Sequence, residues 1–165
     1  MSYYVGLPLM FILALTEAAV LPKLRIAGLQ PNLVLVVLVA WLTLRGASEA
    51  FILIPFAGLC LGLVDGAPLG TALLALAPLA IIQDLQGSRL HQGAFVLTIV
   101  FVVVMTLAYH LVYFAVYTAA GHGGSVTDAL TQVIVPTTLL NITVLLPAYV
   151  LISMSAQERR RAAYV

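Results

Sequence analysis

The stretch QPNLVLVVLVAW, Gln30 to Trp41, decides the fold because three residues suited to a membrane surface are followed by nine apolar ones. Proline disfavours helix in the residue before it and suits a first helical turn. Gln30, Pro31 and Asn32 therefore mark the entry of a helix that is apolar on all sides. Such a helix is either a buried core element or one wall of a membrane bundle.

The composition of the whole chain indicates an integral membrane protein. Of its 165 residues, 63% are hydrophobic and 8% are charged, and the mean hydropathy is +1.15. These values lie far outside the range of soluble domains. A net charge of +1 creates no long-range field, which argues against a nucleic acid partner.

Six apolar segments predict an all-α integral membrane protein, a bundle of about six transmembrane helices forming one domain over residues 1–165. The alternating polarity of a transmembrane barrel is absent from the sequence. A straight crossing of a ~30 Å hydrocarbon core needs about 20 residues, so the second, third and fourth segments are short. They are either short spanning helices, which we expect, or re-entrant pieces. The segments are 3–21, 32–44, 50–64, 69–83, 94–120 and 129–153.

The basic residues predict the orientation, because basic loops stay on the cytoplasmic side. With both termini cytoplasmic, Lys23 and Arg25 lie outside and the other five basic residues lie inside. Those five are Arg45, Arg89, Arg159, Arg160 and Arg161. The last three form a juxtamembrane cluster that favours anionic lipid headgroups.

Glu17 lies four residues before the end of the first apolar segment. A carboxylate at this depth is costly unless it reaches the surface, pairs or becomes protonated. Lys23 and Arg25 are candidate partners. A structural role and a role at a ligand or partner surface both fit.

Four glycines, Gly58, Gly62, Gly66 and Gly70, recur every fourth residue. Gly58 and Gly62 form a small-residue face that another helix could approach closely, either in this bundle or from a partner. Gly66 with Pro68 is typical of a turn.

Two polar spots interrupt the last two segments. His110 lies one turn from Thr106 and beside a stripe of tyrosines at 109, 113 and 117, which predicts aromatic packing and a local hydrogen bond. Asn141 is expected to form interhelical hydrogen bonds. Pro136, in the sixth segment, fits a packed kink, a hinge or a binding notch.

No sequence motif for catalysis is visible. The sequence lacks a phosphate-binding GxxxxGK[ST], HExxH, GxSxG and paired His or Cys ligands. We therefore expect neither an enzyme nor a cofactor or metal.

Two stretches resemble the bacterial rod shape-determining protein MreD family. LQPNLVLVVLVAW, residues 29–41, resembles the start of that family's second helix, where Pro-Asn precedes an apolar run. FAGLCLGLVDGAPLGTALLAL, residues 56–76, resembles its glycine-rich third helix, turn and following helix. Chain size, segment order and the short basic tail agree. In two departures, Gln30 replaces a basic residue and Asp65 is displaced by about one turn from the family's acidic position.

The resemblance implies a non-enzymatic scaffold of the cell-elongation machinery in the bacterial inner membrane. It would bind the bitopic protein MreC and, directly or indirectly, MreB and a RodA-type glycosyltransferase with its transpeptidase partner. Lateral-wall peptidoglycan synthesis and rod shape would depend on it. The candidate partner-binding residues are Glu17, Gln30, Pro31, Asn32, Gly58, Gly62, Asp65, Gly66 and Gly70.

Two alternatives remain open from the residues. A helix entry explains residues 30–32 without a ligand, whereas a second interpretation places a partner or ligand pocket beside Asp65. The six-helix plan also resembles the substrate-binding subunits of energy-coupling-factor vitamin transporters, which use an AxxxA spacing for docking. Ala14 and Ala18 have this spacing.

Overall fold

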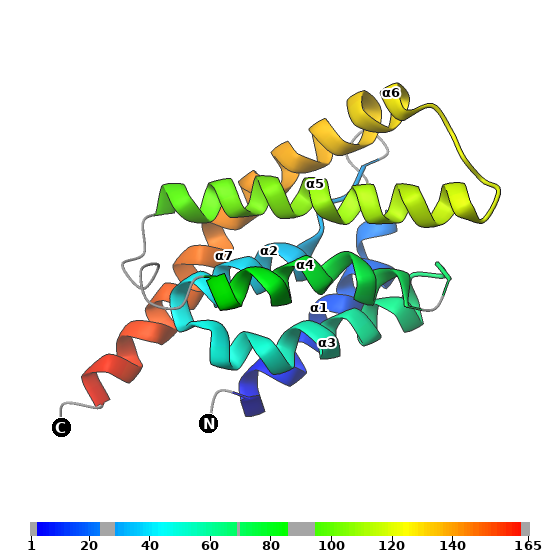
Figure 1. The fold of residues 1–165 in the computed structure, drawn as a ribbon. Coiled ribbons are helices and arrows are strands. Elements are labelled where there is room, and N and C mark those ends of the chain that lie inside the picture. The colour runs from blue at the N-terminus through cyan, green and yellow to red at the C-terminus, as the bar shows by residue number, and fades with distance from the viewer. Residues whose placement is uncertain (1–2, 24–28, 69, 86–94, 163–165) are drawn as a thin grey trace.

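The computed structural model describes residues 3–23, 29–68, 70–85 and 95–162, and in these ranges the protein is an all-α bundle (Figure 1). Helices α6, η3 and α7 run on without a break, and η3 is a π-helix. The elements are α1 (Tyr3–Ala19), η1 (Leu21–Lys23), α2 (Leu33–Arg45), α3 (Ala47–Val64), α4 (Thr71–Leu85), α5 (Phe95–Ala119), α6 (Val126–Asp128), η3 (Ala129–Ile134) and α7 (Val135–Ala162). The expected helical fold class is confirmed.

Helix lengths divide the bundle into two groups. Three stretches within the described residues, 4–23, 95–119 and 126–155, are long and apolar enough to cross a membrane. Helices α2, α3 and α4 are apolar but shorter. Large apolar side chains cover the outside of α1, α3, α5 and α7, among them Val5, Leu63, Val96 and Leu151. Such a surface suits lipid or partner helices rather than water.

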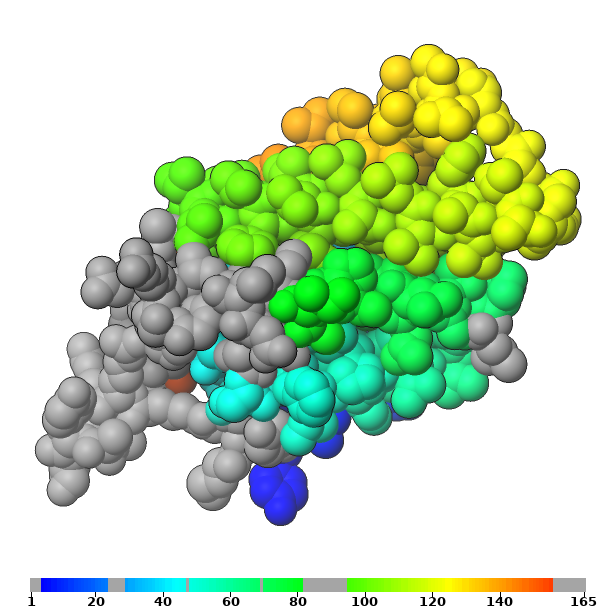
Figure 2. Space-filling model, viewed as in Figure 1, coloured from blue at the N-terminus to red at the C-terminus, as the bar shows by residue number. Residues whose placement is uncertain are grey.

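Helix α2 is the centre of the bundle. It packs against α1, α3, α4, α5 and α7, and every residue from Val34 to Thr43 is buried. In Figure 2 the face towards the viewer is formed by α3, α4 and α5. The run of apolar residues in α2 has no polar face because other helices surround it on every side. With 13 residues, α2 is about 20 Å long and ends inside the length of its neighbours.

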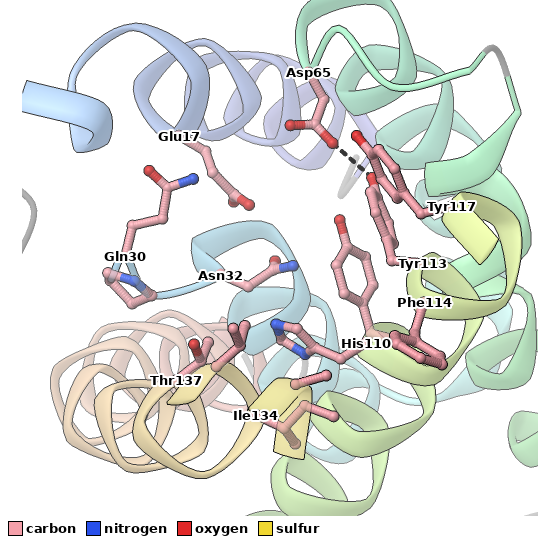
Figure 3. A pocket seen from close by; sticks show the side chains of 14 residues that line it. Glu17, Gln30, Asn32, Asp65, His110, Tyr113, Phe114, Tyr117, Ile134 and Thr137 are labelled. Carbon is pink, nitrogen blue, oxygen red and sulfur yellow. Dashed lines mark hydrogen bonds between the residues drawn. The ribbon is translucent and has the colours of Figure 1, made fainter. Parts of the chain in front are cut away.

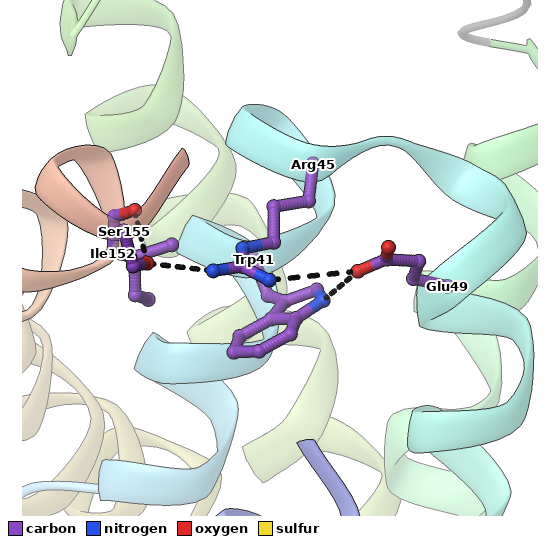
Figure 4. Close-up of polar contacts among 5 residues, drawn as sticks. All are labelled: Trp41, Arg45, Glu49, Ile152 and Ser155. Atoms are coloured by element: carbon purple, nitrogen blue, oxygen red, sulfur yellow. Dashed lines mark hydrogen bonds and ion pairs between the residues drawn. The ribbon is translucent and has the colours of Figure 1, made fainter. Parts of the chain in front are cut away.

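Polar contacts hold the C-terminal end of α2 to α3 and α7 (Figure 4). Trp41 Nε1 donates to Glu49 Oε2 at 3.2 Å. The Arg45 guanidinium lies 4.3 Å from the Trp41 ring centroid and pairs with Glu49 at 3.9 Å. Arg45 Nη2 also donates to Ser155 Oγ at 2.6 Å. These contacts place the cation at the negative end of the helix, where it is favoured, and fix α2 between two neighbours.

The glycine repeat joins α3 to α4. A Cβ on Gly58 would lie 2.9 Å from Leu73 Cα, and one on Gly62 would lie 3.9 Å from Gly70 N. Gly66 and Gly70 have φ of +67° and +91° and form the turn between the helices. The Gly58 and Gly62 face is thus occupied by α4, which agrees with internal packing. The turn expected at Gly66 is confirmed.

Gly58→Ala should destabilise the bundle by about 1–3 kcal/mol, because the new methyl group meets the backbone of α4. Gly62→Ala is the matched control on the same helix. Its methyl group finds ordinary van der Waals contacts, so we expect a change within about 1 kcal/mol. Reversible unfolding in mixed micelles measures both. Equal stability of the two variants would contradict the close approach at Gly58.

Candidate functional site

A cleft of about 370 Å³ lies at the N-terminal end of α2 (Figure 3). It is at the end of the bundle remote from the start of α1 and the end of α7 (Figure 1). Among the described residues, α1 packs against neither α5 nor α7, whereas α2 packs against all three. Because α2 begins at Leu33, the space beyond its first turn stays open. The lining residues are Glu17, Gln30, Pro31, Asn32, Asp65, Tyr109, His110, Tyr113, Phe114, Tyr117, Ala129, Val133, Ile134 and Thr137.

The floor of the cleft is the first turn of α2. Asn32 is the N-cap, and its Oδ1 accepts from Leu35 N–H at 2.8 Å. Glu17, only 9% exposed, accepts from Val34 N–H through Oε2 at 3.0 Å. The two side chains satisfy N–H groups that a helix start leaves unpaired, and the carboxylate lies at the positive end of the helix dipole.

Lys23, one of the two candidate partners of Glu17, does not pair with it. Within the described residues Glu17 bonds to the backbone of α2, and no ion pair joins it to Lys23. The packing of α1 against α2 brings the carboxylate to the α2 N-terminus. Arg25, the other candidate, lies outside the described residues.

Asn141 joins three helices beneath the cleft. Its Oδ1 accepts from Asn32 N–H at 2.7 Å, and its Nδ2 donates to Thr106 Oγ1 at 2.9 Å. Asn141 and Thr106 are fully buried. The interhelical hydrogen bonding expected for Asn141 is confirmed, and it ties α7 to both α2 and α5.

Tyrosines of α5 form one wall. The Tyr109 and Tyr113 rings stack at 4.7 Å between centroids, and Tyr113 and Tyr117 at 6.4 Å. Tyr113 OH donates to Asp65 Oδ2 at 2.7 Å. Among the described residues α3 does not pack against α5, so this hydrogen bond links the end of α3 to α5 across the cleft.

His110 also faces the cleft from α5 (Figure 3). Its Nδ1 lies 2.8 Å from the carbonyl oxygen of Thr106. A carbonyl can only accept, so Nδ1 donates and carries a proton. The local hydrogen bond predicted between these residues is confirmed, and Nε2 remains for contacts within the cleft.

The opposite wall is the π-helical segment η3. Val135 N–H bonds to the carbonyl of Leu130, five residues earlier. The next residue, Pro136, has no N–H to donate, and a proline ring clashes with the carbonyl four residues before it. Wider turns of this kind are frequent at functional sites. Ala129 and Val133 from this segment line the cleft, so Pro136 fits the interpretation of a notch.

The structure brings together five of the nine predicted site residues: Glu17, Gln30, Pro31, Asn32 and Asp65. The four glycines do not line the cleft. A pocket beside Asp65 therefore exists, and its role in binding stays a prediction. The sequence interpretation missed the wall of α5, because tyrosines at every fourth position were assigned to packing alone.

Comparison with known proteins places the chain in a family. The family model described as rod shape-determining protein MreD matches residues 1–157. The chain belongs to the MreD family. Membership supports a role in determining rod shape and confirms the resemblance noted in the sequence. No match was found among curated proteins or solved structures.

The transporter alternative gains no support from these MreD-family comparisons. Its AxxxA step begins at Ala14, which is fully buried. Helix α1 therefore presents this position to the bundle interior, where a docking partner cannot reach it.

Asn141→Leu should destabilise the bundle by about 1–2 kcal/mol, since it leaves Asn32 N–H and the Thr106 hydroxyl without a partner. Thr143→Val is the control. Thr143 is exposed on the same helix and bonds only to its own backbone, at Leu139, so we expect a change within about 0.5 kcal/mol. Unfolding in mixed micelles compares them. A stable Asn141→Leu variant would show that the bridge is dispensable.

Proposed function

We propose that the protein is a non-enzymatic membrane scaffold of the cell-elongation machinery. In this role it binds MreC and supports lateral-wall peptidoglycan synthesis. MreB and the RodA-type glycosyltransferase with its transpeptidase join the same assembly, directly or through MreC. Family membership supports the role in rod shape, and the choice of partners is our inference from the family resemblance.

The cleft is the observation that carries the proposal. Five residues expected to contact partners come from separate segments and meet there. Polar side chains at its floor and beneath it tie α1, α2, α5 and α7 together, which preorganises the cleft. Preorganised surfaces lose less entropy when a partner binds. Exposed apolar faces of α1 and α7 give a partner's membrane helix room to pack beside the cleft.

We place the protein in the bacterial inner membrane as one transmembrane domain, with both termini cytoplasmic. The start of α1 and the end of α7 lie at the same end of the bundle (Figure 1), which is compatible with this orientation. The cleft then opens on the extracytoplasmic side. The distribution of basic residues in the sequence favours the same orientation. The side chains of Arg159, Arg160 and Arg161 and all of Arg89 lie outside the described residues.

Reporter fusions test the orientation. A fluorescent protein at the C-terminus should fold and fluoresce, because it stays in the cytoplasm. Alkaline phosphatase inserted after His122, in the loop between α5 and α6, should be active, because it needs an oxidising compartment. The opposite pattern would reverse the bundle and place the cleft on the cytoplasmic side.

Mild extraction of the tagged protein from its native membrane tests the scaffold. Native mass spectrometry should find MreC retained with the wild-type chain and absent from an unrelated tagged membrane protein. Gln30→Ala should lower the retained MreC, because Gln30 lines the cleft and its Oε1 makes no hydrogen bond within the described chain.

Gln132→Ala is the matched control, since Gln132 is exposed on η3 and is not a lining residue. Thermal unfolding of both variants shows whether the bundle is intact. Failure of the wild-type chain to retain MreC would refute the scaffold. Equal retention by the two variants would place the MreC contact elsewhere on the bundle.

A further inference from the structure

The charge of the cleft is unbalanced. Two carboxylates line it, Glu17 at the buried floor and Asp65 at the exposed mouth. No lysine or arginine is among the described residues that line it. A carboxylate this deep in a membrane protein is normally paired or hydrogen-bonded. Glu17 has the α2 N-terminus as one partner, and the cleft leaves space for a second.

The remaining polar groups add acceptors. Gln30 Oε1 is buried and has no hydrogen-bond partner within the described chain. Glu17, Gln30 and Asp65 also line an adjoining cavity of about 170 Å³, so these three side chains separate the two spaces. Asp65 accepts from Tyr113 through one oxygen, Oδ2, and a carboxylate can accept more than one donor. The oxygens of Glu17, Gln30 and Asp65 are therefore complementary to a group that only donates.

The stacked tyrosines limit the kind of contact. Tyr113 stacks on Tyr109 with 4.7 Å between ring centroids, and Tyr117 lies 6.4 Å away on the same stripe, so the rings partly cover one another. The wall therefore offers hydroxyl groups and ring edges more than open ring faces. A ligand that binds by stacking a flat ring would find little platform here. A hydrogen-bonding cation would find acceptors along the depth of the cleft.

We propose that the cleft binds the guanidinium or ammonium group of an arginine or lysine side chain from a partner protein. This proposal rests on the scaffold function and names the chemical group that the cleft would bind in the partner. Guanidinium and ammonium groups have several donors and no acceptor, and they pair strongly with carboxylates. About 370 Å³ holds one long side chain with some water, since a water takes about 30 Å³.

A phospholipid amine fits less well. Its ammonium is joined through a short linker to a phosphate, which would enter the same acceptor-rich space. No cationic side chain among the described lining residues could receive that phosphate. Like charges brought together at short range oppose binding. The cation of an arginine or lysine side chain has no phosphate attached to it, so it avoids this repulsion.

Binding of blocked amino acids to the full chain in non-ionic maltoside micelles tests the proposal. The probe is N-acetyl-arginine methylamide, and its neutral near-isostere N-acetyl-citrulline methylamide is the matched control. Saturation-transfer NMR measures both. The arginine probe should bind at least about tenfold more tightly than the citrulline probe, because only the cation pairs with carboxylates. Equal binding of the two would overturn the proposal.

Three variants locate the bound probe. Glu17→Gln and Asp65→Asn remove one charge each while keeping an oxygen that can accept from Val34 N–H or Tyr113 OH. Each should weaken the arginine probe by about tenfold. Asp128→Asn removes the same charge from an exposed residue outside the lining and should change affinity less than twofold. Unchanged binding in both cleft variants, with melting temperatures like wild type, would overturn the site.

Phosphatidylethanolamine added to the micelles separates the protein source from the lipid source. It should leave the arginine probe bound. Displacement of the probe would show that the cleft takes a lipid amine and would overturn the proposal. Failure of the wild-type chain to retain MreC counts against the scaffold alone, whereas loss of charge preference in the probe experiment counts against the cation site alone.

Discussion

The burial of α2 is the constraint on which the rest of the structure depends. A helix of 13 residues surrounded by protein cannot leave its terminal N–H and C=O groups to water, and each unpaired group would be costly in a membrane. Neighbouring helices supply the partners at the N-terminal turn, which Glu17 and Asn141 reach from α1 and α7. At the other end Gly46 N–H bonds to the Leu42 carbonyl, and the Arg45 side chain is held by α3 and α7. The packing of the longer helices therefore depends on contacts at both ends of α2.

The same shortness creates the cleft. Helix α5, with 25 residues, is about 37 Å long, and α2 is about 20 Å. Longer helices packed around a shorter one leave a space beyond its end unless side chains fill it. Here the tyrosines of α5 and the π-helical start of the last helix line that space instead of closing it. The wider turns before Pro136 carry Ala129 and Val133, which line the cleft on the η3 side.

The helices and their order could be predicted from sequence because apolar segments with polar breaks leave few other folds in a membrane. Gly66 and the Pro31-Asn32 entry could be predicted too, since their backbone preferences are local. The partners of Glu17 could not. Lys23 is near in sequence, but the N–H group of Val34 is near in space, and the sequence does not show how α1 packs against α2. The tyrosine stripe was ambiguous for a similar reason, since spacing identifies a shared face and not what that face meets.

Glu17 and Asp65 differ in what they can reveal about the cleft. Glu17 has two roles, because its carboxylate accepts a hydrogen bond from the first turn of α2 and also lines the floor of the cleft. A change there that removes the acceptor disturbs the central helix and the cleft together. Asp65 lies at the mouth and is exposed, and within the described chain its carboxylate accepts a hydrogen bond from Tyr113. Its replacement leaves the burial of α2 intact. If replacing Asp65 weakens partner binding and leaves the melting temperature unchanged, the cleft itself takes part in binding. The same loss at Glu17 is interpreted by comparison with Asp65, because Glu17 also supports α2.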